Sequence, residues 1–489
     1  MKTNKLIMSI AAFAACVSVS AQTSFDAAKL YDEELNGTAR YVGMGGAMSA
    51  LGSDPSVISH NPAGIGTYHN SDINLSMSFF GTSVATDPLY TAYNQGSAKG
   101  IYFYSNNRKS DLMAAVDNVS VIFSGYDGSD CYMNFGFSYR KLQNVDRNLD
   151  YLDKFYDYSQ DDHPKKYVVY REYVDRQRNK VNSYDFNLSC NLSDMLYLGW
   201  TLGILSTDTW SEGYYYDFYP SSYEAAKEDQ DFIYYDEKMD YTSVDKMNSA
   251  KGTGWNMAFG LIVRPVSPLR LGLSVKTPTA FKQRLEYADY AYAIQGKQQD
   301  GNKYTNSIDY KFSSPWSINL SGGLTIGHTA IGVEYEKHFT DRSSLSIDNT
   351  QMNKQGALHY QDYSTFKIGI EQNISNLSLR AGYNSVGSMF KEDSFVYLSD
   401  SDFNNSRMDW QNDRPGKSKY CTLGLGYCSE PDRDGTQFYF DLAYVHGVKN
   451  SVLNTNEPVD NPEITNMTNV DVNYKYKTDK VMFTVGWNF

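Results

Sequence analysis

Several stretches of the chain alternate strictly between apolar residues and residues that are polar or small. At the C-terminus, apolar side chains occupy every second position from Val481 to Phe489, and the positions between them are mostly small or polar. The same alternation runs from Leu196 to Ile204 and from Phe438 to Tyr444. Successive side chains of a β-strand point to opposite faces, so each stretch predicts a strand with one apolar face.

Stretches of this kind predict about fourteen strands after residue 71, an even number as in bacterial membrane barrels. The expected strands cover 72–80, 118–124, 131–142, 181–191, 195–206, 252–264, 268–289, 304–325, 329–340, 359–373, 376–390, 415–428, 436–448 and 470–489. In the last of them, the apolar positions from Val470 to Tyr476 have the opposite parity from those that begin at Val481. We therefore expect a β-bulge near 478–480, with two short strands as the alternative.

The connections between these strands alternate between short and long. Short polar turns are expected at 191–194, 373–376 and 429–435, and long connections at 143–180, 207–251, 390–416 and 449–468. Outer-membrane barrels have short turns at one end and long loops at the other. No stretch after residue 21 reaches the roughly 18 consecutive apolar residues of a membrane-spanning helix. The pattern therefore predicts an all-β fold, a transmembrane antiparallel β-barrel over residues 72–489.

Composition supports a β-rich fold and narrows the function. The 489 residues include 42 Tyr and 36 Gly but only 13 Pro; Tyr is enriched in strands, and Gly permits tight turns. The formal net charge of -13 argues against a basic surface for nucleic acid, so no nucleic-acid partner is expected. We recognise no nucleophile-elbow, zinc-protease or paired-carboxylate motif, and the chain is therefore expected not to be an enzyme.

Residues 1–21 have the features of a cleaved signal peptide. Lys2 and Lys5 form a positive start, an apolar run follows from Leu6 to Val17, and Ala21 ends a small-residue cleavage site. An uncleaved anchor and lipidation at Cys16 are the alternatives. The sequence thus predicts an exported protein, located in a Gram-negative type of outer membrane.

The cysteines that follow this segment are Cys131, Cys190, Cys421 and Cys428. An even number in an exported protein invites a disulfide interpretation. However, Cys421 and Cys428 lie an odd number of positions apart in one expected strand, which places them on opposite faces. We expect small apolar strand residues rather than a metal or redox site.

Residues 22–71 contain no clear strand and are rich in small residues. They include Gly43, Gly45, Gly46 and the sequence Asn61-Pro62-Ala63-Gly64. The glycines do not complete a dinucleotide-binding fingerprint, and no strand precedes them, so nucleotide binding is not expected. A glycine-rich segment ahead of a barrel instead predicts a hatch, or plug, that folds back into the lumen.

Two runs in this segment resemble the hatch of a known family. The runs from Thr38 to Ala47 and from Ile58 to Gly64 are similar to the N-terminal hatch of the FadL/TodX-type outer-membrane transporters of long-chain fatty acids and aromatic hydrocarbons. Asn61-Pro62-Ala63 matches the hatch motif of that family. Further along the chain, four segments resemble its strands, at 252–265, 269–279, 314–316 and 377–383.

The resemblance implies a monomeric barrel of fourteen strands that takes up hydrophobic molecules passively. Ligand would enter from outside, the hatch would shift, and the ligand would leave sideways into lipid. The family places this exit at a kink in its third strand, here expected at 131–142, where Gly136 is the candidate. Fatty acids or aromatic hydrocarbons are the implied ligands, and no cofactor or metal is expected.

The expected hatch and gating residues are Asn61, Pro62, Ala63, Gly64, Gly43, Gly45 and Gly46. The Asn61 amide can bridge backbone groups, and Pro62 fixes one backbone dihedral, so the turn should be rigid. At the other end of the chain, Phe489 closes an alternating strand, a signal that the barrel assembly machinery recognises. The expected partners are therefore this machinery, outer-membrane lipid and hydrophobic small molecules.

Two other functions remain open. A structural or adhesive barrel without dedicated transport would also have long divergent loops, and His60 and His69 raise the alternative of a haem receptor. The acidic, Tyr-rich loop 207–251 could capture apolar ligands or simply place aromatic residues at the membrane boundary. An apolar lumen would favour transport, whereas a lumen filled by charged side chains would favour the structural alternative.

Overall fold

The computed structural model describes residues 24–86, 104–105, 112–126, 131–157, 167–219, 240–295, 298–347, 350–351, 360–390, 412–456 and 469–489. The expected signal peptide with Cys16, and the centres of the expected loops 207–251 and 390–416, lie outside these residues. Nearly all described residues from Asp72 onward belong to strands of one antiparallel sheet.

The strands are β1 (Asp72–Thr86), β2 (Tyr104–Ser105), β3 (Met113–Tyr126), β4 (Cys131–Asp157), β5 (Tyr167–Leu192), β6 (Leu196–Tyr219), β7 (Asp240–Val266), β8 (Leu269–Lys276), β9 (Ala280–Gln295), β10 (Gln298–Ser313), β11 (Trp316–Ile326), β12 (Thr329–Phe339), β13 (Ser344–Ile347), β14 (Thr350–Gln351), β15 (Tyr363–Ile374), β16 (Leu377–Val386), β17 (Asn412–Cys428), β18 (Gln437–Asn456) and β19 (Asn469–Asn488). A short 3-10 turn, η4 (Thr340–Arg342), follows β12.

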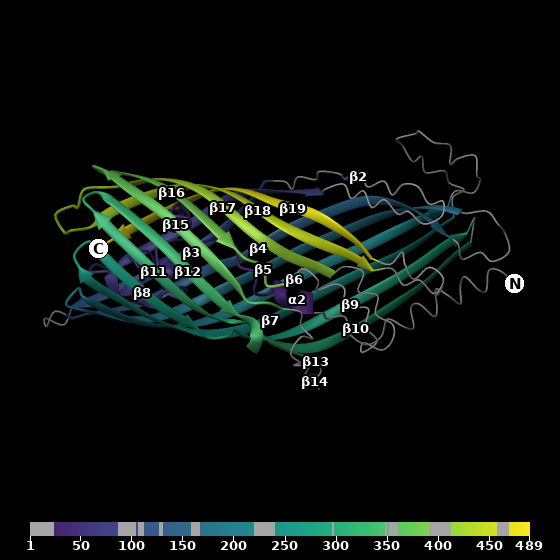
Figure 1. Cartoon of the computed structure of the whole chain (residues 1–489), viewed down its shortest axis with the longest axis horizontal. Helices are drawn as coiled ribbons and strands as arrows, with labels where there is room; N and C mark the ends of the chain where they lie inside the picture. Colours follow the sequence, from purple (N-terminus) through teal and green to yellow (C-terminus); the bar gives the residue numbers. More distant parts are fainter. Residues whose placement is uncertain are drawn as a thin grey trace.

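The sheet closes on itself because β1 pairs with β19 from the Asp72–Asn488 pair to the Thr86–Tyr474 pair. β8 and β9 are two parts of one interrupted wall strand, since both pair with β7, and β10 and β11 form another. β2, β13 and β14 are short additions. Over the described residues the wall is thus a closed antiparallel barrel of 14 strands (Figure 1). The predicted all-β barrel is confirmed.

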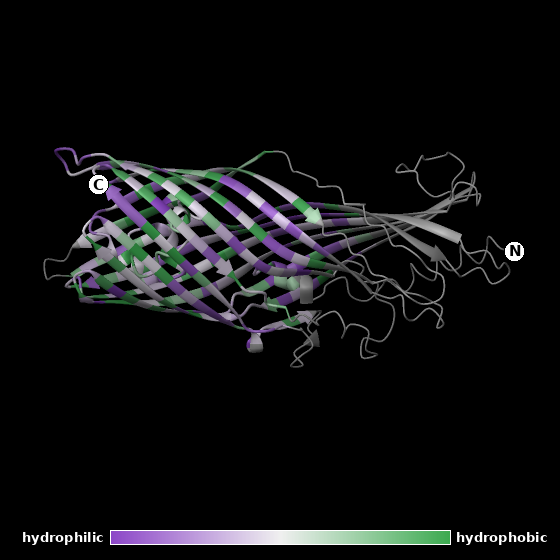
Figure 2. Cartoon of the chain, turned by 45° about the horizontal axis from the view of Figure 1, so that its top comes forward, coloured by the Kyte–Doolittle hydropathy of each residue, from purple (hydrophilic) through white to green (hydrophobic). Residues whose placement is uncertain are grey.

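The wall directs apolar side chains outwards and polar side chains into the lumen. On β19, Val481 and Trp487 are 42% and 47% exposed, whereas Thr484 between them is 0% exposed. On β1, Leu75 is exposed and Ser76 is buried in the same way. Figure 2 shows the alternation of hydrophobic and hydrophilic residues along the strands. An exposed apolar face is stable only when lipid surrounds it, so this is the surface of a membrane barrel.

None of the described helices is long and apolar enough to cross a membrane.

The two ends of the barrel differ. Tight turns join β5 to β6, β11 to β12 and β15 to β16 at the end that also carries the C-terminus, and we call it the short-turn end (Figure 1). Ser71 and Phe489 exchange two backbone hydrogen bonds of 2.9 Å there, which joins the start of the barrel to its last residue. β4 to β7 are the longest strands and extend towards the opposite end, which we call the long-strand end.

The expected bulge near 478–480 is wrong. β19 pairs with β18 and with β1 without any register shift. The parity of the apolar positions changes because Tyr474 and Tyr476 point into the lumen and are buried there, whereas Val481 points outwards. One continuous strand thus has aromatic residues facing the lumen at one end and apolar residues facing lipid at the other.

Candidate functional site

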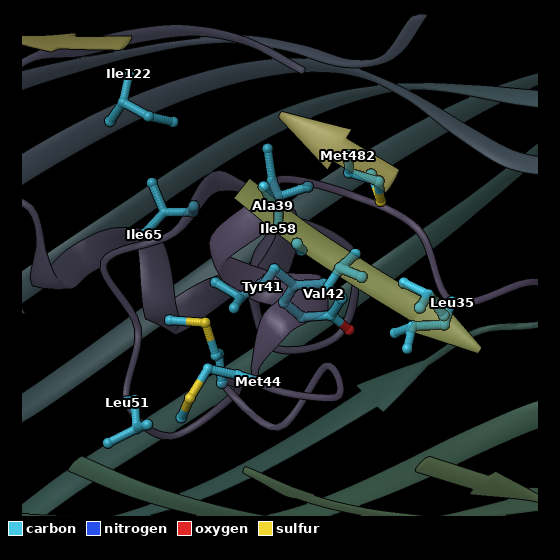
Figure 3. Packing of buried hydrophobic residues seen from close by; sticks show 14 of the residues in the cluster. Leu35, Ala39, Tyr41, Val42, Met44, Leu51, Ile58, Ile65, Ile122 and Met482 are labelled. Atoms are coloured by element: carbon cyan, nitrogen blue, oxygen red, sulfur yellow. The ribbon is translucent and has the colours of Figure 1, made fainter. Parts of the chain in front are cut away.

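The segment before β1 folds inside the barrel. Residues 24–71, which we call the lumen segment, contain α2 (Ser24–Lys29), α3 (Ala39–Gly43) and the 3-10 turns η1 (Pro55–Ser59) and η2 (Pro62–Thr67). Figure 3 shows Tyr41, Val42 and Ile58 of this segment packed together, with Ile122 of β3 and Met482 of β19 alongside. Its placement fits the expected hatch, whose boundaries at 22–71 and separate movement stay predictions.

Side-chain caps fix the short helices of the lumen segment. Thr38 Oγ1 accepts a hydrogen bond from the Tyr41 N–H (3.1 Å) at the start of α3 and donates one to Asp54 (2.6 Å). Asp54 in turn accepts from the Ser56 N–H (2.9 Å) and so caps η1. Burial raises the pKa of Asp54 above its ordinary value despite these hydrogen bonds. The hydrogen bond between the Thr38 hydroxyl and the Asp54 carboxylate thus connects the start of α3 to the start of η1.

The predicted hatch motif forms a capped turn against the wall. Asn61 Oδ1 accepts from the Ala63 N–H (3.2 Å), Pro62 takes the first position of η2, and the Gly64 N–H donates to the Asn61 carbonyl (2.9 Å). The Asn61 amide also donates to the Leu261 carbonyl of β7 (3.4 Å), and its side chain is fully buried. The expected bridging by Asn61 thus has a structural basis, and the gating role of these residues stays a prediction.

Of the three glycines of the first run, Gly43 and Gly45 bring the lumen segment against the wall, whereas Gly46 faces Leu35 and Tyr41 of the segment itself. Gly45 and Gly46 have φ values of 63° and 80°, in the left-handed region that favours glycine. A Cβ on Gly45 would lie 2.7 Å from the Tyr383 nitrogen of β16. A Cβ on Gly43 would lie 3.2 Å from Gly424 Cα of β17. Gly43 and Gly45 therefore permit contact between the backbones of the lumen segment and the wall.

The wall has glycines at the matching positions. Four of them are direct cross-strand neighbours on β11, β12, β15 and β16 and face the lumen segment. We call Gly323, Gly332, Gly369 and Gly382 the glycine row. A Cβ on Gly332 would overlap the Ala47 carbonyl oxygen, and one on Gly369 would overlap the Met44 carbonyl oxygen. This row became apparent only from the strand register, although each glycine was visible in the sequence.

Charged side chains close the lumen near the short-turn end. Arg40 of the lumen segment donates two hydrogen bonds of 3.0 Å to the Glu371 carboxylate of β15. Arg380 of β16 donates to Glu371 (2.6 Å) and to Asp441 of β18. A recess of about 480 Å³ opens beneath this network and is lined mainly by polar side chains. An apolar molecule would find no apolar path through this end.

Two consecutive acids of the lumen segment pair with lysines on distant strands. Asp32 pairs with Lys449 of β18, and Glu33 pairs with Lys276 of β8 at 2.9 Å. Burial by itself would raise the pKa of Glu33, but the Lys276 ammonium more than offsets this and holds that pKa below its ordinary value. The lumen segment is thus held to two sides of the wall.

The wall is irregular where β3 meets β4. The pairing of these strands ends at Asn118 and Arg140, although β4 continues for many residues. The register of β4 with β5 shifts between Lys141 and Gln143, a bulge at this height. We call this region the β3–β4 break. Gly136 lies in the regular part of the ladder, so its role as the wall kink stays a prediction.

The lumen segment binds the backbone at the β3–β4 break. Asn36 Nδ2 donates to Asp117 Oδ1 (2.9 Å) and to the Lys141 carbonyl (2.8 Å). The Glu34 N–H donates to the Leu142 carbonyl (3.0 Å). Residues 34–36 therefore supply hydrogen bonds to backbone that the break leaves without a β-ladder partner on that side.

Towards the long-strand end one side of the lumen carries a large apolar cluster, while another side buries the Arg147–Asp175 ion pair. We call the following buried cluster the apolar chamber: Ala27, Leu30, Tyr31, Leu142, Val181, Leu205, Ala250, Phe281, Leu285, Tyr287, Ile308, Tyr310, Phe312 and Leu345. Most of these side chains come from β4 to β10, and three come from the lumen segment. In the wall strands they are the inward residues, and the sequence alone did not mark them as a cluster.

A cavity of about 100 Å³ lies between the apolar chamber and the lumen segment. Apolar side chains such as Tyr363 and Phe390 line one part of it, and charged side chains such as Glu336 and Lys367 line another. Ligand pockets for drug-sized molecules measure about 300–1,000 Å³. The cavity is therefore smaller than a pocket for a long-chain ligand.

The two histidines of the haem alternative have different neighbours. The His60 ring stacks on Tyr41 at 5.8 Å between ring centroids, whereas His69 Nε2 lies 3.1 Å from Asp194 at the short-turn end. Among the described residues, no group of three or more His, Cys, Asp or Glu side chains is arranged to hold a metal ion. None of the four cysteines in the described part of the chain forms a disulfide, and Cys421 is exposed.

No protein-family model matches the sequence, and no curated protein matches it significantly. Solved structures do match the fold. A Pseudomonas aeruginosa FadL homologue shares 12% identity and a TM-score of 0.57, covering 94% of this chain and 99% of its own. The toluene transporter TodX of Pseudomonas putida shares 15% identity and a TM-score of 0.50, covering 93% of this chain and 99% of its own.

Identities this low establish the fold and leave the ligand open. The likeness spans essentially the whole of both chains. Together with the 14-stranded wall, it confirms the barrel that the resemblance implied. The chain has the fold of the FadL/TodX-type outer-membrane transporters.

Proposed function

We propose that the protein is an outer-membrane channel for passive uptake of hydrophobic molecules. The observation that carries this proposal is the apolar chamber, which ends at the lumen segment at the height of the β3–β4 break. Leu142 belongs to the chamber, and its carbonyl accepts from the Glu34 N–H of the lumen segment. A ligand in the chamber would thus contact the lumen segment, which is the proposed gate, next to the β3–β4 break, which is the proposed exit.

Exit through the wall fits the charges better than exit through the short-turn end. The Arg40–Glu371–Arg380–Asp441 network fills the lumen on that side. Release of an alkyl chain into water costs about 0.8 kcal/mol per CH₂ group, whereas passage into lipid avoids this cost. In the proposed route the long-strand end faces outside, and the ligand enters there. Residues 34–36 then move away from the β3–β4 break, and the ligand leaves through the wall at that place.

The charged part of the lumen favours the structural or adhesive alternative, and the apolar chamber favours transport. The two features overlap at the lumen segment, since the chamber includes Tyr31 and the Glu33–Lys276 pair follows it in the chain, whereas the Arg40–Glu371 pair lies near the short-turn end. A structural barrel would not need an apolar lumen that ends at a break in the wall. We therefore rank transport first, and haem or aromatic hydrocarbons stay open as ligands beside fatty acids.

Binding and release can be tested separately. Purified full-length protein should bind a fluorescent long-chain fatty acid saturably, and deletion of residues 22–71 should weaken this binding. For release, Asn36→Cys with Asp117→Cys can be joined by a short bismaleimide, which would hold the lumen segment to the break. Uptake into proteoliposomes should then fall at least several-fold while binding persists.

A matched control joins two wall strands instead. Thr329 and Gln372 lie opposite each other on β12 and β15, and their side chains are hydrogen-bonded at 2.6 Å. Thr329→Cys with Gln372→Cys, joined by the same reagent, should leave uptake unchanged. Undiminished uptake in the protein joined at the break would refute exit at that place. Absence of binding to fatty acids, toluene and haem would leave the adhesive alternative.

A further inference from the structure

One lysine lies inside the barrel without an acid partner. Lys480 of β19 is 5% exposed, and its direct cross-strand neighbours, Phe80 of β1 and Val445 of β18, are buried apolar residues. Its Nζ lies 5.7 Å from the centroid of the Phe80 ring. In the described part of the chain, Lys480 forms no hydrogen bond or ion pair. The lumen therefore contains a buried ammonium group that no carboxylate neutralises by direct contact.

The other buried lysines and arginines among the described residues all form ion pairs. These pairs are Arg140 with Asp185, Arg147 with Asp175, Lys276 with Glu33, Lys367 with Glu334, and Arg380 with Glu371 and Asp441. Removal of an ammonium group from water is unfavourable unless an anion lies beside it. The contact with the Phe80 ring offsets only part of this penalty. An anion bound at Lys480 would supply the missing partner.

Lys480 lies beside the β3–β4 break. β19, β1 and β3 are adjacent wall strands, and Phe80 pairs both with Lys480 and with Met113, the first residue of β3. The positive charge of Lys480 repels that of Lys141, which lies on β4 at the other side of the break. In the order of the wall strands, the break therefore separates Lys480 from Leu142 of the apolar chamber.

Two acids at the break have other partners. Asp117 accepts a hydrogen bond from the Asn36 amide, and Glu34 Oε2 accepts one from the Asn144 N–H (3.2 Å). Both contacts hold residues 34–36 at the break, and neither acid forms an ion pair with Lys480. When residues 34–36 move away, Glu34 moves with them. A negatively charged group that enters the break could therefore pair with Lys480.

The surroundings of Lys480 suit the head of an amphiphile. Phe80, Val445 and Met482 are buried apolar side chains on β1, β18 and β19. A small inorganic anion would lose its hydration among them without any compensating apolar contact. A carboxylate on an alkyl chain brings apolar surface to the same place, and burial of that surface is favourable. One ammonium group also matches the single charge of a carboxylate.

We propose that Lys480 binds the carboxylate head of an amphipathic ligand at the β3–β4 break. This inference rests on the proposed uptake of hydrophobic molecules and adds a preference for long-chain carboxylates over neutral compounds of the same length. The head pairs with Lys480 while the alkyl chain passes from the apolar chamber through the break into lipid. Lys480 is thus a residue that determines specificity at the exit.

The test compares a fluorescent long-chain fatty acid with the matched fatty alcohol, using the purified full-length protein. The unchanged protein should bind the acid about tenfold more tightly than the alcohol, as expected for one charge-assisted hydrogen bond. Lys480→Met keeps the length of the side chain and removes its charge. It should weaken binding of the acid about tenfold and leave binding of the alcohol unchanged. Lys480→Arg should retain the preference, because the charge stays.

The matched control is Lys477→Met, which removes an ammonium group from the outer face of the same strand and should leave both affinities unchanged. Equal weakening of acid and alcohol in Lys480→Met would assign Lys480 a structural role and overturn the inference. Acetate that competes as well as the long-chain acid would also overturn it, since the site would then be one for free anions. Heat-modifiable migration verifies that each variant is folded.

Failure of this inference is distinguishable from failure of the proposed function. If Lys480→Met binds the acid as tightly as the unchanged protein and uptake into proteoliposomes persists, Lys480 does not select the ligand and the proposed channel stands. If the unchanged protein binds neither the acid nor the alcohol, both proposals are overturned.

Discussion

At the scale of single residues, the absence of a side chain decides how the lumen segment meets the wall. Each member of the glycine row faces backbone or side-chain atoms of the lumen segment that an added Cβ would crowd or overlap. Gly322, one residue before Gly323 on β11, points outwards, and an added Cβ there would meet nothing within 4 Å. Close contact with the lumen segment therefore depends on Gly323 and does not depend on its neighbour Gly322.

Gly332→Ala should loosen the lumen segment, because the new methyl group would overlap the Ala47 carbonyl oxygen. We expect a cost of about 1–3 kcal/mol from overpacking, seen as faster amide exchange over residues 39–52. Gly322→Ala is the matched control and should exchange like the unchanged protein. Equal exchange in the two variants would show that the segment does not depend on this contact.

Asn61→Ala should destabilise η2, since it removes the cap on the Ala63 N–H and the bond to the Leu261 carbonyl. Loss of an N-cap costs about 1 kcal/mol, so amide exchange of residues 62–67 should quicken about five-fold. Asn61→Ser retains a capping oxygen and should recover most of the protection. If Ala and Ser behave alike, the cap does not hold this turn.

At the scale of elements, the lumen segment is held by acids that reach different strands. Glu33 pairs with Lys276, and the ion pair keeps the carboxylate ionised. A carboxyl whose pKa is lower in the folded state stabilises that state above its ordinary pKa. This contribution is lost as the pH falls through the lowered folded-state pKa. The Glu33–Lys276 pair should therefore weaken in acid and keep its contribution near neutral pH.

Amide exchange of residues 32–36 measures this weakening. Protection should be constant from about pH 8 to pH 5 after correction for intrinsic exchange, and should fall below the ordinary Glu pKa of about 4.3. Glu33→Gln should lower protection at neutral pH and flatten the acid response. An unchanged acid response in Glu33→Gln would assign the response to another group, for example Asp32 at Lys449.

At the scale of the whole molecule, closure of the barrel joins its first and last strands. Ser71 and Phe489 exchange backbone hydrogen bonds at the seam, and the Phe489 side chain is 55% exposed to the surroundings of the barrel. The backbone bonds do not require an aromatic side chain. A role of the ring in assembly is therefore separable from a role in stability.

Phe489→Ala should reduce the yield of assembled barrel in outer membranes several-fold, because the assembly machinery would lose its terminal signal. The fraction that assembles should unfold at nearly the same temperature, since the seam keeps its backbone bonds. Phe483→Ala, in the middle of the same strand, should assemble normally. Heat-modifiable migration of membrane fractions measures both, and an unchanged yield for Phe489→Ala would remove this role.

Local patterns were sufficient to predict the number and order of the wall strands. They did not predict the strand lengths, since β4 to β7 continue well into the expected connections 143–180 and 207–251. Strict alternation, as at 481–489, gives each strand one apolar face that is stable against lipid. The order and number of the strands could therefore be predicted from the sequence. The same reasoning failed for β19, where Tyr474 and Tyr476 were read as an outward apolar face. Both lipid and the interior of a barrel accept tyrosine side chains, and alternation does not distinguish between them.

By itself, the sequence determined the strand order, the two kinds of connection and the segment that precedes the barrel, because these depend on residues close together in the chain. Only the tertiary structure decided the glycine row, the apolar chamber and the contacts at the β3–β4 break. Each of these joins residues from strands far apart in sequence, as Asn36 joins Asp117 and Lys141. Strand register and barrel closure bring them together, and neither is specified by the pattern within a single strand.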